Sequence, residues 1–303
     1  MVRRAPTPSP NSDSFLVKVS GISNFPDCGR IIVSVVRRAV ILAFALTACG
    51  GAAKSEPTDA GAPDAERVFH PEEAGARTDA NTARFTYHGG ATLTDMRVAF
   101  VYLDAEEQGG APSFDSFADQ LFVSSHWAGL SEYGIESGIR TTSIRVPRTD
   151  VLPPSSTDKD GLIDQPVFAE AVKSYLHGTT GPRFPDANAV VIFLPAGVNV
   201  VLGQRGSYKW RTCWNADAFH STDGAGDPYI VIPPCASGRR TVALSHELGE
   251  TATDPAAYTA WFSDADQFRS GGELADLCDT ENANAFGFEI ARYWSESKRR
   301  CVP

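Results

Sequence analysis

The chain has 303 residues, a formal net charge of −10 at pH 7 and a sequence pI of about 5.1. Residues 1–48 hold six of the 27 basic and two of the 37 acidic side chains, so the remainder carries a net charge of −14. Nucleic-acid binding needs cationic surface to neutralise phosphates. This charge therefore argues against a nucleic-acid partner and is compatible with an exported protein or with cation binding.

A short apolar run, residues 39–48, follows Arg37 and Arg38 and ends at Cys49. Two positive charges, a ten-residue apolar stretch and small residues before a cleavage point are typical of a secretory signal peptide. A membrane-spanning helix needs about 20 residues. The closing Leu-Thr-Ala-Cys resembles the bacterial lipobox, which implies that Cys49 becomes the lipid-bearing first residue of the mature protein. We therefore expect anchoring in the cell envelope, on the outer membrane of a cell with two membranes, with secretion as the alternative.

Composition then divides the chain into four segments. Residues 1–34 have no signal-like character, and we expect them to be untranslated or unstructured. The signal peptide occupies 35–48. Residues 49–83 are mostly Ala, Gly, Pro, Asp and Glu and cannot bury enough apolar surface to offset ordering entropy, which predicts a disordered tether. Residues 84–303 are numerous enough for a single folded core.

The folded segment alternates strand and helix patterns. Continuous apolar runs predict buried strands at 96–103, 189–194 and 229–232, an alternating run predicts a strand at 141–146, and a late strand or hairpin arm is expected at 286–294. Helical spacing occurs over 114–130, 165–176 and 241–254. This order predicts an α/β fold with a mostly parallel central sheet. It is similar to the order in the amino-terminal half of zincin metallopeptidases, so a zincin-like domain is expected.

Four cysteines lie in the folded segment: Cys213, Cys235, Cys278 and Cys301. An even number in an exported chain favours disulfides. Of the three pairings that four cysteines allow, we predict the neighbour pairing, Cys213–Cys235 and Cys278–Cys301.

The predicted helix 241–254 carries the residues with the clearest chemical pattern. Leu244, Leu248 and Ala252 form an apolar stripe, and His246 and Glu250 share another face because they are four residues apart. Glu247 follows His246 as the general base does in the zinc-peptidase pattern His-Glu-x-x-His, here with glutamate in place of the second histidine. His246 and Glu250 are therefore candidate metal ligands, and Glu247 is the candidate base that takes a proton from metal-activated water.

A catalytic zinc usually has three protein ligands, and three residues are candidates for the third. His220 would complete a His-His-Glu set, Glu273 lies 23 residues beyond Glu250, and Asp254 lies one helical turn beyond Glu250. The Glu273 spacing is similar to that of the downstream glutamate in gluzincins, which implies that Asp276 orients the histidine.

The stretch from His246 to Asp279 is strongly acidic. Its acidic residues are Glu247, Glu250, Asp254, Asp264, Asp266, Glu273, Asp276 and Asp279, with Arg269 as the one basic residue. Carboxylates gathered without a cation repel one another, so we expect bound zinc, with calcium or another divalent metal as the alternative. A solvated acidic surface with a His246–Glu250 ion pair is the competing interpretation.

Four stretches together carry a family resemblance: residues 133–135, 193–198, 245–255 and 272–278. They resemble a group of secreted bacterial and fungal proteins with a Ser-His-Glu-x-x-Glu-x-x-Thr-Asp-Pro signature, distant relatives of the plant Exordium (phosphate-induced) proteins. In that group a Gly-Tyr-His motif precedes the signature helix, whereas here the residues before His220 are Asp217, Ala218 and Phe219. The resemblance implies a metallopeptidase-like fold.

Two functions follow from these patterns. The first is a surface-anchored, zinc-dependent metallohydrolase, a peptidase acting on protein or peptide substrates. The second is a non-catalytic envelope or adhesion lipoprotein that uses the same fold.

Overall fold

The structure is a computed structural model. It describes residues 84–104, 114–178, 181, 184–205, 207–235, 239–264, 271–278 and 281–303, and the backbone of 31–37 and 40–46. The chain forms two compact units, Met1–Pro63 and Asp64–Pro303. In the first, β1 (Ile31–Arg37) and β2 (Val40–Leu46) pair antiparallel. Cys49 and the predicted tether lie outside the described residues, so the signal peptide, lipid anchor and tether stay predictions.

The second unit is built on a five-stranded sheet of order β10-β11-β7-β4-β5. Its strands are β4 (Asp95–Leu103), β5 (Ser137–Val146), β7 (Ala189–Phe193), β10 (Phe219–Thr222) and β11 (Pro228–Ile232). The pairings β4–β5, β4–β7 and β7–β11 are parallel, whereas β10 runs antiparallel at the edge. The predicted α/β fold with a mostly parallel sheet is confirmed. The continuous apolar runs arise because both faces of such a sheet are covered.

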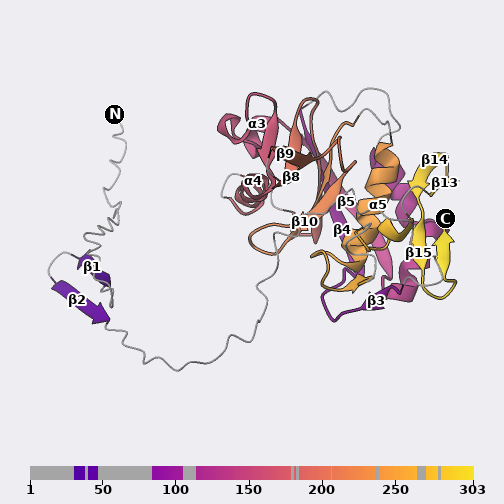
Figure 1. The fold of residues 1–303 in the computed structure, drawn as a ribbon, viewed down its shortest axis with the longest axis horizontal. Helices are drawn as coiled ribbons and strands as arrows, with labels where there is room; N and C mark the ends of the chain where they lie inside the picture. Colours follow the sequence, from indigo (N-terminus) through magenta and orange to yellow (C-terminus); the bar gives the residue numbers. More distant parts are fainter. Residues whose placement is uncertain are drawn as a thin grey trace, which may run out of the picture. The chain divides into compact units, whose positions relative to one another are not determined.

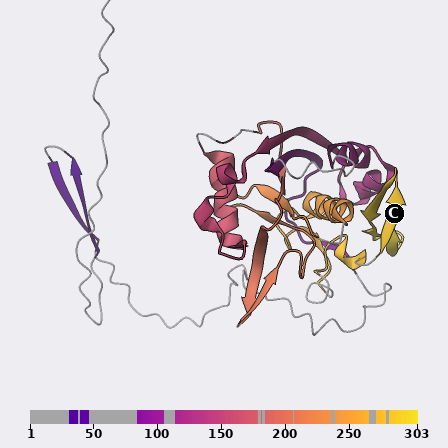
Figure 2. The same ribbon diagram turned by 90° about the horizontal axis from the view of Figure 1, so that it is seen from above.

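Each face of the sheet packs against a different set of helices. Along β4, Val98 and Phe100 belong to one apolar core and Ala99 and Val101 to the other, because successive side chains alternate between faces. The first core includes residues of α1 (Phe114–Phe122) and α5 (Arg240–Thr253), and the second includes residues of α4 (Gln165–His177). Figures 1 and 2 show α4 and α5 on opposite sides of the sheet.

Shorter elements surround this framework. The short helices are α2 (Ser125–Ala128), η3 (Gly129–Tyr133), α3 (Arg148–Val151), η4 (Pro154–Ser156) and η5 (Asp276–Cys278). A three-stranded sheet consists of β6 (Leu162–Asp164), β8 (Asn199–Arg205) and β9 (Tyr208–Arg211). The other strands lie in two-stranded pairs: β3 (Thr86–Tyr87) with β12 (Trp261–Phe262), β13 (Asn282–Ala285) with β14 (Phe288–Ala291), and β15 (Tyr293–Ser295) with β16 (Arg300–Val302). In the part of the chain that the structure describes, no helix combines the length and apolarity needed to cross a membrane.

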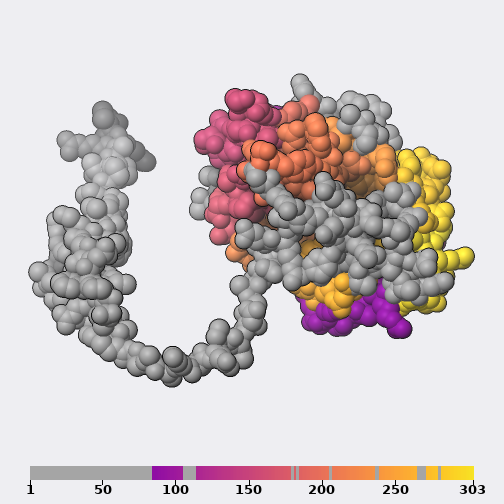
Figure 3. Space-filling model, viewed as in Figure 1, coloured from indigo at the N-terminus to yellow at the C-terminus, as the bar shows by residue number. Residues whose placement is uncertain are grey.

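Two expected elements are divided in the structure. The helix expected over 114–130 breaks after Phe122, where Ser124 caps the next turn by accepting a hydrogen bond from the Trp127 amide. The late strand expected over 286–294 becomes parts of two hairpins, which form one flank of the unit in Figure 3. In both cases the apolar pattern continues across a backbone break, so periodicity alone does not reveal it.

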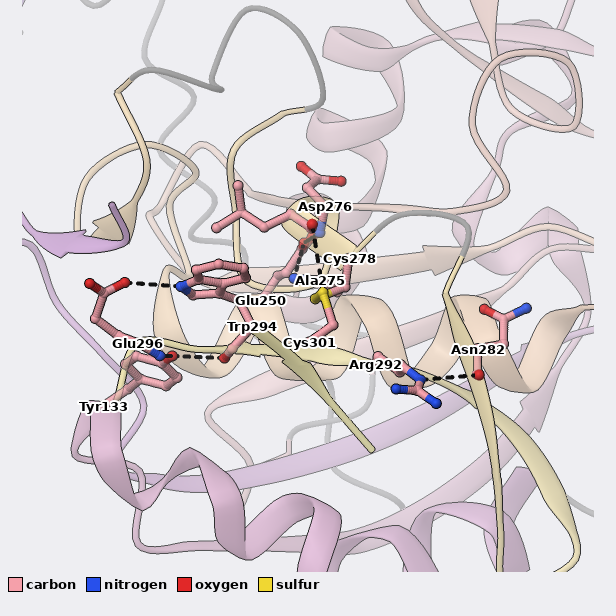
Figure 4. The surroundings of a disulfide bond; sticks show 11 residues. Tyr133, Glu250, Ala275, Asp276, Cys278, Asn282, Arg292, Trp294, Glu296 and Cys301 are labelled. Carbon is pink, nitrogen blue, oxygen red and sulfur yellow. Dashed lines mark hydrogen bonds between the residues drawn. A yellow bond between two sulfur atoms is a disulfide. The ribbon is translucent and has the colours of Figure 1, made fainter. Parts of the chain in front are cut away.

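Both predicted disulfides are present. Cys213 is bonded to Cys235 and Cys278 to Cys301. The second bond joins the segment after α5 to β16, and Figure 4 shows it beside the contact between Glu250 and the backbone of Ala275 and Asp276.

Candidate metal centre

Helix α5 is buried along almost its whole length. Leu244, Leu248 and Ala252 are fully buried in the core under the sheet, as their spacing predicts. The opposite side of α5 is also covered, because Glu247 and Glu250 are buried. This helix therefore places a row of charged side chains in the protein interior, where they must be paired.

Gly249, in the middle of α5, makes room for a side chain. A Cβ at this position would lie 2.6 Å from Cζ of Tyr293, whose hydroxyl donates a hydrogen bond to the Ser245 carbonyl. The side chain that approaches Gly249 is therefore the aromatic ring of Tyr293. Gly249 thus allows β15 to pack directly on the helix.

His246 meets two carboxylates at one ring nitrogen. Its Nε2 lies 3.1 Å from Glu250 Oε1 and 3.3 Å from Asp276 Oδ1. Glu250 Oε1 also accepts hydrogen bonds from the amides of Ala275 and Asp276, both at 3.1 Å (Figure 4). The three side chains form a group whose ligand atoms lie close enough to hold one metal ion.

Asp276 reaches His246 because of the loop before it. Gly271 adopts a φ of +96°, and a Cβ there would lie 1.7 Å from Asp276 Oδ2. The Trp294 amide donates to the Leu274 carbonyl, which holds the same segment against β15. The resemblance to gluzincins implied that Asp276 orients the histidine. In the structure its carboxylate lies 3.3 Å from His246 Nε2, the same ring nitrogen that Glu250 contacts.

His220 supplies a second histidine next to α5, from the antiparallel edge strand β10. Its Nδ1 lies 3.0 Å from Glu247 Oε2 and 3.9 Å from Glu250 Oε2. Its Nε2 lies 3.1 Å from the Asp254 carbonyl, which can only accept a hydrogen bond. Because Nε2 donates to that carbonyl, the Nδ1–Glu247 contact requires a second proton or a cation. His220, Glu247 and Glu250 form a second group that is able to hold a metal.

Glu273 and Asp254, the other candidate ligands, have different surroundings. Glu273 is buried, and its Oε1 lies 3.4 Å from His220 Nε2 without a hydrogen bond in the described part of the chain. The carboxylate of Asp254 accepts hydrogen bonds from the amides of Thr259 and Ala260 and from the Thr259 hydroxyl. Asp254 therefore holds the loop after α5, and its side chain is outside both metal-capable groups.

We call the six converging side chains the α5 cluster: His220, His246, Glu247, Glu250, Glu273 and Asp276. Its four carboxylates outnumber its two imidazoles, so two negative charges remain even when both rings are protonated. A bound divalent cation would reduce this negative charge, and the mixed nitrogen and oxygen donors are suitable ligands for zinc. The unsatisfied buried oxygen of Glu273 is a further sign that the cluster needs a cation or protons.

The pKa values in the cluster reflect this crowding. Burial, with Glu250 and Asp276 nearby, raises the pKa of Glu273 to about 8, and burial with Glu250 nearby raises that of Asp276 to about 7. Burial alone would lower the pKa of His246, but Glu250 and Asp276 hold it well above its ordinary value. The adjacent His246 lowers the pKa of Glu250 despite its burial. Without a metal, the cluster must hold protons to remain neutral.

Comparisons with protein-family models, with curated proteins and with solved structures gave no match for this chain. The family resemblance and the zincin-like assignment are thus expectations from sequence motifs alone. A functional proposal for this protein therefore depends on the geometry of the α5 cluster.

Proposed function

We propose that the α5 cluster is the metal centre of a zincin-like, zinc-dependent hydrolase that cleaves proteins or peptides. The observation that carries the proposal is the convergence of Glu250 and Asp276 on His246 Nε2, at 3.1 and 3.3 Å. These three residues would hold the metal, with calcium or another divalent cation as the alternative to zinc. A cation bound there supplies a Lewis acid and lowers the pKa of water.

The residues around His246 supply the other parts of a hydrolytic site. Glu247 follows His246 on α5, is buried, and contacts His220 Nδ1 at 3.0 Å. A carboxylate next to a metal-ligating histidine is well placed to accept a proton from a water nucleophile. His220 holds Glu247 in a fixed orientation, and the Asp254 carbonyl fixes the His220 ring in turn. In this proposal Glu247 is the general base and His220 its positioning partner.

One observation favours a second function. Glu247, Glu250, Glu273 and His220 are all buried, with exposed fractions of 9% or less. Two cavities of about 410 and 1200 Å³ in the described part of the chain are lined by other residues. Closed metal sites with no open position are typical of structural metals. The alternative is a non-catalytic envelope or adhesion lipoprotein whose metal stabilises the fold.

The proposed location follows from the leader and the cysteines. A lipid on Cys49 would attach the folded domain to the cell envelope, where the two disulfides are chemically stable. The substrate would then be an extracytoplasmic protein or peptide.

The test compares the parent protein with Glu247→Gln for zinc content and for hydrolysis of an unfolded generic protein. Asp264→Asn is a matched control, because Asp264 belongs to the same acidic stretch but its side chain is exposed. Among the described residues its one ion-pair contact is with His88, whose Nε2 lies 4.0 Å from Asp264 Oδ2. A hydrolase predicts that Glu247→Gln keeps zinc and loses hydrolysis, whereas Asp264→Asn keeps both. Zinc without hydrolysis in the parent would support the structural alternative, and hydrolysis by Glu247→Gln at the parent rate would contradict the assigned base.

A further inference from the structure

A further group of side chains that could hold a metal ion lies at the end of α4, outside the α5 cluster. His177 is the last residue of α4, and Asp223 and Asp227 belong to the loop that joins β10 to β11. The Nε2 atom of His177 lies 3.0 Å from Asp223 Oδ2 and 3.0 Å from Asp227 Oδ2. The three ligand atoms all lie within 4.8 Å of one another. We propose that His177, Asp223 and Asp227 bind a divalent cation, and we call this group the α4 site.

A single proton on His177 does not account for both carboxylate contacts of the α4 site. The Nε2 atom carries at most one hydrogen, which makes one straight hydrogen bond. That hydrogen bond joins His177 Nε2 to Asp223 Oδ2, whereas Asp227 Oδ2 contacts the same nitrogen as an ion pair at the same 3.0 Å. A cation between the three atoms contacts all of them at once. Two carboxylates, one neutral imidazole and one divalent ion also have no net charge.

Asp223 is fixed in place before any ion binds. Its side chain is fully buried, and its Oδ1 accepts hydrogen bonds from the amides of Ala225 and Asp227 at 2.8 and 3.0 Å. The Asp223 amide in turn donates to the Asp227 carbonyl. These bonds close the loop and leave Oδ2 directed at His177. Oδ2 contacts His177 Nε2 at 3.0 Å, so both oxygens of this buried carboxylate are held in place and Oδ2 borders the position that the cation would occupy.

The surroundings allow an ion to enter and to keep free coordination positions. The side chains of His177 and Asp227 are 43% and 60% exposed. Both also line the cavity of about 410 Å³, together with Leu176, Phe184, Asn188 and Pro228. The C-terminal end of α4 carries a partial negative charge that favours a cation. Lys173, one turn earlier on α4, pairs with Glu170 at 3.5 Å, and its side chain also passes beside Gly224 of the loop that carries the two aspartates.

An ion at the α4 site would connect α4 to the hairpin that presents His220. Asp223 directly follows β10, and His220 lies within that strand. One nitrogen and two carboxylate oxygens suit zinc or manganese better than a soft metal. Cation binding at the α4 site would therefore stabilise the edge strand next to the α5 cluster.

Zinc binding to single variants of the full chain tests the proposal, measured by equilibrium dialysis at neutral pH. Asp227→Asn removes an exposed ligand, His177→Gln removes the imidazole, and Asp160→Asn is the control because its side chain is similarly exposed, at 59%, and pairs with Lys159 instead. We expect Asp227→Asn and His177→Gln each to lose one zinc equivalent, or to bind that equivalent at least tenfold more weakly than Asp160→Asn.

The same comparison in a His246→Ala background separates this site from the α5 cluster. There the α5 cluster has lost a ligand, and the zinc equivalent lost through Asp227→Asn must still be seen. The proposal is overturned if Asp227→Asn and Asp160→Asn bind zinc with the same stoichiometry and affinity in both backgrounds.

Discussion

Replacing Gly249 by alanine should destabilise the protein although alanine is the better helix former. The intrinsic gain is about 1 kcal/mol. Against it, the new Cβ would lie 2.6–2.7 Å from Cζ, Cε1 and the hydroxyl of the buried Tyr293 ring. Overpacking of this kind costs roughly 1–3 kcal/mol, and displacing the ring would weaken the hydrogen bond from Tyr293 to the Ser245 carbonyl by about 1 kcal/mol. The expected net loss in the free energy of unfolding is about 1–3 kcal/mol.

Chemical denaturation of Gly249→Ala beside Gly129→Ala measures this effect. Gly129 has a helical φ of −62°, and among the described residues outside its own turn no atom lies within 4 Å of the Cβ it would gain, so its replacement should be neutral or stabilising. Combining Gly249→Ala with Tyr293→Leu should show a favourable coupling, since the smaller side chain removes the clash. The reasoning is refuted if Gly249→Ala matches or exceeds the parent in stability.

Three further predictions concern protons, the loop after α5 and the leader. Glu273 and Asp276 have raised pKa values, so the metal-free folded state binds more protons than the unfolded state from about pH 4.5 to about pH 8. Its free energy of unfolding, measured by chemical denaturation, should therefore fall as the pH rises across that range. A rise would contradict this prediction. Asp254→Ala removes the acceptor of three donor groups on residues 259 and 260 and should cost about 2–3 kcal/mol while zinc is retained. Zinc loss at unchanged stability would count against the assigned loop role. Cys49→Ser should accumulate as an unprocessed precursor that no longer enters a detergent phase, whereas maturation like the parent would exclude a lipid at this residue.

Local patterns in the sequence were sufficient to predict several features. The i, i+4 spacing of His246 and Glu250 brings their side chains to 3.1 Å because a single helix determines that distance. The neighbour pairing of the four cysteines and the parallel sheet were also predicted, since both follow from nearby or continuous sequence features.

Contacts that depend on the path of loops were not predictable in the same way. Asp276 meets His246 because the chain at Gly271 takes a positive φ and packs against the carboxylate of Asp276. His220 meets Glu247 because the edge strand β10 lies beside α5, which no local pattern reveals. The paired glycines at 271 and 272 were the available signal for the first contact.

No sequence pattern distinguishes His177, because its partners lie 46 and 50 residues away in a loop. Asp223 and Asp227 flank the segment Gly-Ala-Gly, a pattern that predicts a turn. A turn with an aspartate at each end was a signal for two converging carboxylates, but the position of α4 was needed to add the histidine.

The central claim, a metal held by His246, Glu250 and Asp276, is tested most directly by the zinc content of His246→Ala beside Asp264→Asn. Removing the imidazole takes away the donor on which both carboxylates converge. We predict that His246→Ala holds one zinc equivalent fewer than Asp264→Asn and that zinc no longer raises its melting temperature to the same extent. Equal zinc content in the two variants would contradict the claim, and His246 and Glu250 would then form a partly buried ion pair without a metal.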